Sequence, residues 1–396
     1  MILSLCVFAH IQFDVVLIHI QILFLSIQNF DRNNDTWKGN LWKRAQLEQS
    51  NIGYPVTNNN KYIEGNIMKI NTIASSIILT VVALGGTGNS LADTSGETQN
   101  PIVLVHGLSG FDSILGDYFY GVRNALNNVG ADDVYTPQIA GWESNEARGE
   151  ELLAYVEDLV ATTGVTKVNL IGHSQGGATS RYVASVRPDL VASVTSVGSP
   201  HFGSEVADIL KDSPLQGPAI AIGNAVGIFL AVLSGDSSQQ VNAMGSLESL
   251  NTEGALAFNA DHPQGLRQGA CQETPSYNVG RWWWPNWVKD YSVNDGAHEV
   301  NGINYYSWSG TYNPVFDSNI LDPADALLGV TWWMVSESSD GVVGRCSSHM
   351  GKVIRDDYTM NHADEINGMW GIRSLWAHNP VQLYVDHARR LKNTGL

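Results

Sequence analysis

A serine lies between two glycines in the segment Gly172-His173-Ser174-Gln175-Gly176, a spacing suited to nucleophilic catalysis. The segment follows the apolar run Val168–Ile171, which is typical of a buried strand, and it precedes an apolar-periodic helix that ends before Pro188. A strand that turns sharply into a helix needs small neighbours, and it lifts the serine hydroxyl to the positive end of the helix dipole. The sequence therefore predicts a strand–turn–helix element with Ser174 as nucleophile. An inert serine at a glycine-rich helix start is the alternative.

Backbone N–H groups near such a serine are needed to stabilise an oxyanion. The compact strand Pro101–Val105 runs directly into His106-Gly107-Leu108-Ser109-Gly110, which would leave unpaired N–H groups pointing outward at the strand's end. We expect this segment to supply donors if it lies beside the nucleophile. A simple turn is the other interpretation.

A serine hydroxyl is a weak nucleophile, so a histidine must take its proton and a carboxylate must orient that histidine. Many acidic residues after Ser174 fit the order serine, acid, histidine. We favour Asp340, because Asp340-Gly341 follows the apolar run Thr331–Val335 and predicts an exposed turn after a strand at the sheet's edge. A plain turn aspartate is the alternative.

The candidate bases all follow Asp340. His362 lies in the polar, turn-like stretch MNHADE, whereas we expect His378 and His387 in the final amphipathic helix. The sequence therefore favours His362 among the candidates His349, His362, His378 and His387.

Strands and helices alternate around these residues. Asn145–Thr163 has apolar residues at helical spacing and predicts an amphipathic helix that Gly164 ends, directly before the serine strand. Val194–Val197 and Asn301–Gly310 predict further strands. This alternation indicates an α/β fold with a mostly parallel central sheet covered by helices on both faces.

Two apolar segments remain unassigned by that pattern. Pro214–Leu233 has almost no polar face and predicts either a helix buried all round or a mobile lid that opens on lipid. The segment Arg281-Trp282-Trp283-Trp284-Pro285-Asn286-Trp287 is too rich in indole for an ordinary surface loop. Its side chains are expected to pack on the body or to lie at an oil–water boundary.

The leading 92 residues have a different character. Residues 68–92 have a basic Lys69, an apolar run and a Ser-x-Ala end, the layout of a secretory signal peptide cleaved after Ala92. We expect residues 1–67 to be a mis-assigned upstream extension. A signal-anchor helix at the start is the alternative, although Asp14 would be costly in a bilayer.

Charge and cysteine content narrow the class of protein. Residues 93–396 carry 16 Lys/Arg and 34 Asp/Glu, so they repel phosphate backbones and nucleic-acid binding is not expected. Beyond Cys6, only Cys271 and Cys346 remain. Such a pair predicts one disulfide in an exported protein and two free thiols in a cytosolic one.

The chain from about Asn100 to Leu396 resembles the bacterial true lipases of family I, the Pseudomonas–Burkholderia type. The resemblance rests on PIVLVHGLSGFD, KVNLIGHSQGG, RYVASVRPDLVASVTSVGSPHFGS, GSLESLN, YYSWSG, LDPADA, DGVVGRCSSHMG and MNHADEIN. It implies an α/β-hydrolase fold with a helical lid at about residues 213–240. By position it implies Ser174 as nucleophile, Asp340 as acid and His362 as base, oxyanion donors at the N–H groups of Leu108 and Gln175, and a disulfide between Cys271 and Cys346.

The resemblance also implies one structural calcium ion. Asp322 and Asp364 match the family's carboxylate ligands, and Gly368 and Ile372 match its other two ligand positions. Glycine replaces the usual glutamine at position 368, where a backbone carbonyl would still be available. A second departure is the Trp-rich insertion at about residues 275–299, which puts substrate preference in doubt.

We therefore expect residues 93–396 to form a secreted, monomeric lipase that hydrolyses long-chain triacylglycerols at a lipid–water interface. The resemblance further implies a membrane-tethered, lipase-specific foldase as partner during export. A carboxylesterase or polyester depolymerase with the same triad is the first alternative. A non-catalytic, membrane-anchored lipid-binding protein is an alternative of another class.

Overall fold

The computed structural model describes residues 93–108, 117–212, 243–275, 292–319, 321–374 and 376–396. The predicted upstream extension, signal peptide and lid, together with residues 276–291 of the Trp-rich insertion, lie outside these ranges. Among the helices that the structure describes, none combines the length and the apolar character that crossing a membrane requires.

The described residues build a mixed sheet that is mostly parallel, with strand order β2-β1-β3-β4-β7-β8-β5 and β6 paired to β7. Only β5 and β6 pair antiparallel to their neighbours. The strands are β1 (Ile102–Val105), β2 (Val134–Tyr135), β3 (Val168–His173), β4 (Val191–Val197), β5 (Val293–Asn294), β6 (Glu299–Val300), β7 (Ile303–Thr311) and β8 (Lys352–Thr359).

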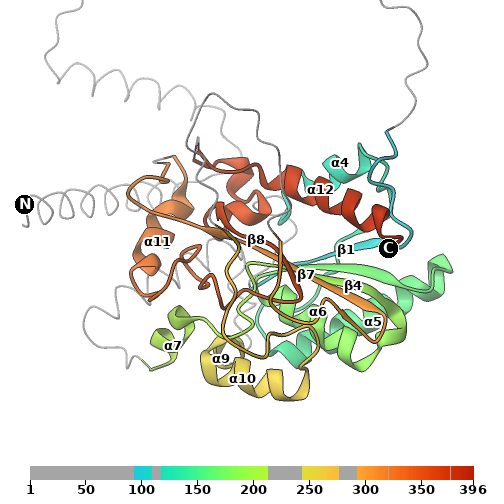
Figure 1. Cartoon of the computed structure of the whole chain (residues 1–396), viewed down its shortest axis with the longest axis horizontal. Coiled ribbons are helices and arrows are strands. Elements are labelled where there is room, and N and C mark those ends of the chain that lie inside the picture. Colours follow the sequence, from blue (N-terminus) through green and yellow to red (C-terminus); the bar gives the residue numbers. More distant parts are fainter. Residues whose placement is uncertain (1–92, 109–116, 213–242, 276–291, 320, 375) are drawn as a thin grey trace, which may run out of the picture. The chain divides into compact units, whose positions relative to one another are not determined.

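Helices cover both faces of this sheet (Figure 1). On one face lie α5 (Asn145–Thr163) and α6 (Gln175–Val186), and on the other lie α4 (Val122–Asn127) and α12 (Pro380–Asn393). The further described helices are α7 (Glu205–Asp212), α9 (Ala243–Leu250), α10 (Thr252–Asp261) and α11 (Pro323–Trp332), with 3₁₀ turns at Pro188–Leu190, Asp364–Ile366 and Met369–Gly371.

The alternation of side chains along β1 explains the two-sided core. Val103 and Val105 pack with α5 and α6, whereas Ile102 and Leu104 pack with α4 and α12. All four side chains are buried, as expected for an internal parallel strand. The sheet is therefore a closely packed, rigid support for the residues that follow the ends of its strands.

Three details differ from the sequence-based expectations. The strand predicted over Asn301–Gly310 begins at Ile303, because Asn301 and Gly302 form a turn with positive φ between β6 and β7. The apolar run Thr331–Val335 is no strand, since Thr331 and Trp332 end α11. His378 lies before α12, which begins at Pro380, and its ring contacts Thr359 and Arg355 instead.

Candidate active site

Ser174 occupies the sharp turn between β3 and α6 in a strained conformation, with φ 54° and ψ −129°. Its N–H donates to the carbonyl of Val197 on β4 at 2.9 Å, which fixes the turn to the sheet. A Cβ on Gly172 would overlap the backbone of Gly176, and a Cβ on Gly176 would overlap the carbonyl of Val105. Both flanking glycines are therefore required by the close approach of helix and strands.

His362 and Asp340 form a close pair in the loops beyond the carboxyl ends of the strands. The Nδ1 atom of His362 lies 2.6 Å from Oδ2 of Asp340, and the His362 N–H donates to the Asp340 carbonyl at 2.9 Å. Oδ1 of Asp340 accepts the N–H groups of Val342 at 2.8 Å and Val343 at 2.7 Å. Because a carboxylate only accepts, Nδ1 of His362 carries the proton and Nε2 is left to take one.

Asp340 is fully buried, not in the exposed turn that the sequence suggested. Its burial is tolerated because N–H groups surround the carboxylate on both oxygens.

Parallel strands bring these residues together from distant parts of the chain. Ser174 follows the carboxyl end of β3, and His362 comes shortly after the carboxyl end of β8. The ring of His173, beside the serine, lies 4.5 Å from the ring of His362. Loops beyond the carboxyl ends of the strands are where α/β folds place their ligand sites.

The loop after β1 lies directly against the serine. A Cβ on Gly107 would come within 2.6 Å of the Ser174 Cβ, so the Gly107-Leu108 backbone passes the nucleophile closely. The N–H of Gln175 is the first of α6 and has no acceptor within its own helix. Both predicted oxyanion donors thus belong to segments that adjoin Ser174.

The sequence analysis missed a buried arginine that supports this loop. Arg148 is fully buried in α5, donates from Nη2 to the His106 carbonyl at 2.6 Å, and also donates to the Ala140 carbonyl. Burial lowers the pKa of Arg148 to about 10, so it remains a cation at neutral pH. One signal was available, because Arg148 precedes the buried Leu152 by four residues and therefore shares the apolar face of its helix.

The sequence analysis also missed Glu365, a buried carboxyl beside the histidine. Its Oε2 lies 3.8 Å from His362 Nδ1, and its Oε1 accepts the Gly310 N–H at 2.6 Å. Burial and the neighbouring Asp340 carboxylate raise the pKa of Glu365 well above its usual range. The neutral acid is therefore the favoured form, which leaves Asp340 as the charged partner of His362.

Three buried aspartates, Asp322, Asp325 and Asp364, lie at the start of α11 and after β8, and we call the region that holds them the aspartate lobe. Burial raises the pKa of Asp322 to about 7 and that of Asp364 to about 8, and Asp325 adds its own charge to both. Among the described residues, none of the three forms an ion pair with a basic side chain, although the charge of Arg373 acts to lower the pKa of Asp364. Concentrated buried carboxylates of this kind are the donor set that a hard cation prefers, so the lobe is compatible with a bound metal ion.

The carbonyl of Gly368, another predicted ligand, accepts the N–H of Gly371 at 2.9 Å. Among the described residues, the groups of three side chains whose ligand atoms lie within 4.8 Å of one another are two different ones, and the three carboxylates of the aspartate lobe are not among them. His173, His362 and Glu365 belong to the candidate catalytic machinery, and the second group, Cys271, Asp295 and His349, includes a disulfide sulfur.

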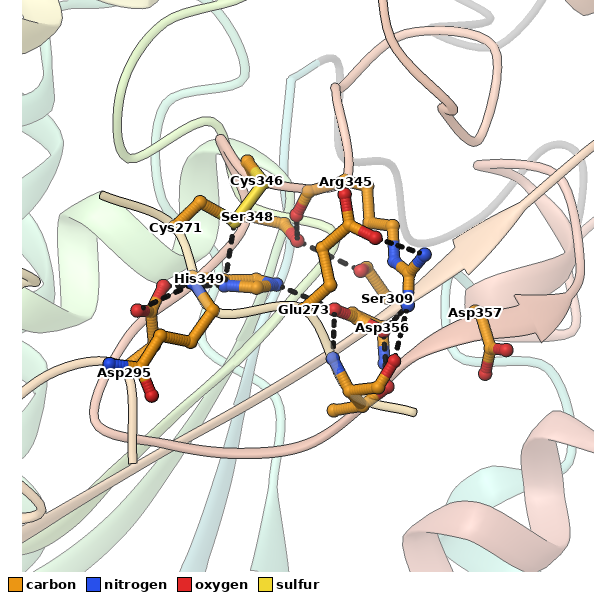
Figure 2. A network of polar contacts seen from close by, with 12 residues as sticks. Cys271, Glu273, Asp295, Ser309, Arg345, Cys346, Ser348, His349, Asp356 and Asp357 are labelled. Carbon is orange, nitrogen blue, oxygen red and sulfur yellow. Dashed lines mark hydrogen bonds and ion pairs between the residues drawn. A yellow bond between two sulfur atoms is a disulfide. The ribbon is translucent and has the colours of Figure 1, made fainter. Parts of the chain in front are cut away.

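Cys271 and Cys346 are joined by a disulfide with a Cα–Cα distance of 5.8 Å. Beside it, His349 is buried between two carboxylates, with Nδ1 2.7 Å from Asp295 and Nε2 2.9 Å from Asp356 (Figure 2). Arg345 also pairs with Asp356, at 2.6 Å. His349 is thus engaged on both nitrogens and is not available as a base for Ser174.

Comparisons with known proteins identify the family. Residues 100–328 match the model of the alpha/beta hydrolase fold. The chain is 46% identical over 331 residues to a triacylglycerol lipase of Vibrio cholerae, a match that covers 82% of this chain and 98% of the relative. It is 42% identical to a triacylglycerol lipase of Pseudomonas fragi (77% of this chain, 100% of the relative) and 40% identical to one of Burkholderia plantarii (77% and 89%).

Proposed function

The chain belongs to the α/β-hydrolase family and, within it, to the bacterial triacylglycerol lipases, and from this premise we propose that it hydrolyses long-chain triacylglycerols through an acyl-enzyme formed on Ser174. The observation that carries the proposal is the Asp340–His362 pair, whose imidazole ring lies 4.5 Å from that of His173, the residue directly before a serine in a strained strand-to-helix turn. This arrangement supports Ser174 as nucleophile, His362 as base and Asp340 as the acid that orients it.

The reaction proceeds in two halves. The Ser174 hydroxyl attacks the ester carbonyl carbon while Nε2 of His362 takes the hydroxyl proton, and the N–H groups of Leu108 and Gln175 bind the oxyanion. His362 then protonates the departing diacylglycerol oxygen. Water attacks the acyl-enzyme in the same way, His362 takes its proton, and the fatty acid leaves with Ser174 restored.

The decisive assay is hydrolysis of emulsified triolein by the wild type and a Ser174→Ala variant. We expect the variant to lose activity by about 10⁶-fold, because the nucleophile and its base act as one unit. A variant that retains activity would contradict the role of Ser174. A wild type that cleaves soluble short esters but not triolein would identify a carboxylesterase. The same result would contradict the lid predicted at about residues 213–240.

We further propose that the metal of the aspartate lobe is calcium, held by the carboxylates of Asp322 and Asp364 and the carbonyls of Gly368 and Ile372. The raised pKa values of the two carboxyls support a cation there. The ion would be structural: Asp364 lies two residues after His362, so a bound cation would hold the loop that carries the base.

Chelation tests this assignment without relying on activity. Removing calcium should lower the Tm of the wild type by about 5 °C, as expected for loss of a ligand bound well above its Kd, and calcium but not magnesium should restore it. The Asp322→Asn variant should have a low Tm that chelator does not change. An identical Tm of the wild type with and without chelator would exclude the ion.

We also propose that the protein is exported from the cell. A signal-peptide-like segment at residues 68–92 and a disulfide-bonded pair of cysteines support a secreted protein that acts at a lipid–water interface. Several large apolar side chains are exposed in the aspartate lobe and at the end of α11, which is consistent with contact to lipid: Phe316, Leu321, Trp333, Trp370 and Trp376. A lipase-specific foldase during export and a monomeric mature protein remain our expectations.

A further inference from the structure

A tyrosine and a histidine connect the loop after β1 with the loop that carries His362. The N–H of Gly107 donates to the hydroxyl oxygen of Tyr118 at 3.0 Å. That hydroxyl lies 2.8 Å from Nδ1 of His173, whose Nε2 lies 3.0 Å from the backbone carbonyl oxygen of His362. Tyr118 is partly buried and His173 almost completely so.

The chemistry of these groups fixes the direction of each hydrogen bond. A carbonyl oxygen only accepts, so Nε2 of His173 carries a proton and donates it to His362. Burial, with a further contribution from His362, lowers the pKa of His173 well below its usual range, so the ring is neutral and Nδ1 is bare. Nδ1 therefore accepts from the Tyr118 O–H, and the Tyr118 oxygen accepts from Gly107.

We propose that Tyr118 and His173 are positioning residues, which hold the oxyanion loop and the catalytic-base loop in register through one directed chain of hydrogen bonds. Gly107 immediately precedes Leu108, the proposed oxyanion donor, and His362 is the proposed base. A shift of either loop stretches the same chain. The inference rests on the proposed roles of Ser174, Leu108 and His362.

The geometry explains why both residues are needed. Ser174 lies against Gly107 and directly follows His173, and its attack requires the oxyanion donor and the base to be correctly placed at the same moment. Glu365 shares the His173 Nε2 at 3.3 Å, but its pKa is raised and its Oε2 accepts no hydrogen bond among the described residues. The link across the site therefore runs through Tyr118 and His173.

Removing only the Tyr118 hydroxyl tests the inference. The Tyr118→Phe variant should lower kcat on a soluble short-chain ester about tenfold with KM within twofold, because the loops lose register while the aromatic ring is kept. Tyr384→Phe is the matched control. Tyr384 is fully buried in the same region, and its hydroxyl has no hydrogen-bond partner within the described part of the chain, so its kcat should equal that of the wild type.

The imidazole nitrogens give a second readout that a merely structural role would not move. Two-bond ¹H–¹⁵N spectra should show His173 as the Nε2–H tautomer in the wild type and a mixture of tautomers in Tyr118→Phe. His173→Asn, which keeps an acceptor near the Nδ1 position but loses the donor to His362, should lower kcat as Tyr118→Phe does. The double variant should be no worse than either single one.

Each result has a distinct meaning. A folded Tyr118→Phe variant with wild-type kcat overturns the inference, and so does an Nδ1–H tautomer of His173 in the wild type. If Tyr118→Phe does not fold, the His173→Asn kinetics and the wild-type spectrum decide instead. The Ser174→Ala variant in the same assay separates the two levels: its loss of activity beside a fully active Tyr118→Phe rejects only the positioning role.

Discussion

Single atoms decide much of the geometry around Ser174. Gly198 follows β4 with φ +51°, and its α-carbon lies against the carboxyl group of Glu365. Because Glu365 is buried and sits beside His362, anything that displaces it also displaces the base loop. Positions of this kind tolerate neither a methyl group nor a change of backbone conformation.

The Gly198→Ala variant should therefore be destabilised by about 3 kcal/mol or more, since backbone strain and overlap with Glu365 add together. Gly164→Ala is the matched control. Gly164 also has a positive φ, 77°, but an added Cβ meets nothing within 4 Å, so only the conformational cost of about 1 kcal/mol remains. Urea unfolding measures both, and equal losses would show that Glu365 moves aside freely.

At this scale the sequence indicated the strand–turn–helix around the proposed nucleophile better than the environment of the other proposed site residues. Ser174 sits in a local pattern, because the turn needs glycine at both flanks within five residues. Glu365 and Asp340 acquire their environments from segments far away in the chain, such as the Gly310 N–H and the Asp340–His362 contact. No local pattern records such contacts, so the burial of Asp340 was not predictable from its Asp-Gly turn signal.

At the scale of the elements, the position of the loop between α11 and β8 depends on contacts with other segments of the chain. It carries Asp340 but no regular structure beyond one bridge between Ser339 and Gly344. The Cys271–Cys346 disulfide, the Arg345–Asp356 ion pair and the buried hydrogen bond of His349 to Asp295 attach its end to three other segments (Figure 2). The acid of the proposed triad is thus held by a covalent and electrostatic anchor, since the sheet itself does not reach it.

Replacing both Cys271 and Cys346 by serine should lower the free energy of unfolding by about 4 kcal/mol, the loop-closure value for a separation of 75 residues. Urea unfolding with and without a dithiol reductant measures the effect. The wild type should lose stability when reduced, and the double serine variant should not change. A reduced wild type as stable as the oxidised one would show that the buried polar contacts of Arg345 and His349 suffice.

The helices and strands were predictable to the extent that their signals are local. The bounds of α5 were predicted from its apolar spacing and Gly164, and they match the structure, in which Ser144 caps the start of the helix. The prediction of a strand at Thr331–Val335 was wrong, because a run of only five residues is too short for its periodicity to distinguish a helix end from a strand. The prediction that His378 lies in the final helix was also wrong, because α12 begins at Pro380, with Asn379 as the residue before it.

At the scale of the whole molecule, burial keeps five histidines of the described part of the chain in their neutral form, four in the interior and His378 at a partly exposed position. Burial lowers the pKa of His106 to about 3 and of His378 to about 4, and it lowers the pKa values of His173, His201 and His387 well below 6.5. An unfolded histidine titrates near 6.5, so below that pH the unfolded chain binds more protons than the folded one. The five groups therefore favour unfolding as the pH falls from about 6.5 to about 4.

Two carboxyls act in the opposite direction. The pKa of Asp322 is raised to about 7 and that of Asp364 to about 8, so without a cation the folded state binds more protons than the unfolded state below those values. A cation bound between them keeps both ionised and removes this compensation. With calcium in excess, we expect the five histidines to outweigh the remaining acids whose pKa values burial raises, Asp317, Asp325, Glu337 and Glu365, so that the net effect is a loss of stability in acid.

We therefore expect the free energy of unfolding, measured by urea with excess calcium, to fall steadily between about pH 6.5 and about pH 4, at up to about 1.4 kcal/mol per pH unit for each fully buried histidine. His387→Gln isolates one contribution. Its imidazole lies 2.7 Å from Thr195 Oγ1, so the variant should be less stable than the wild type near pH 7, and the difference should shrink as the pH falls. A difference that is constant with pH would mean that His387 has the same pKa in the folded and unfolded states. With calcium removed, the acid-induced loss of the wild type should be smaller, because Asp322 and Asp364 then take up protons on the folded side.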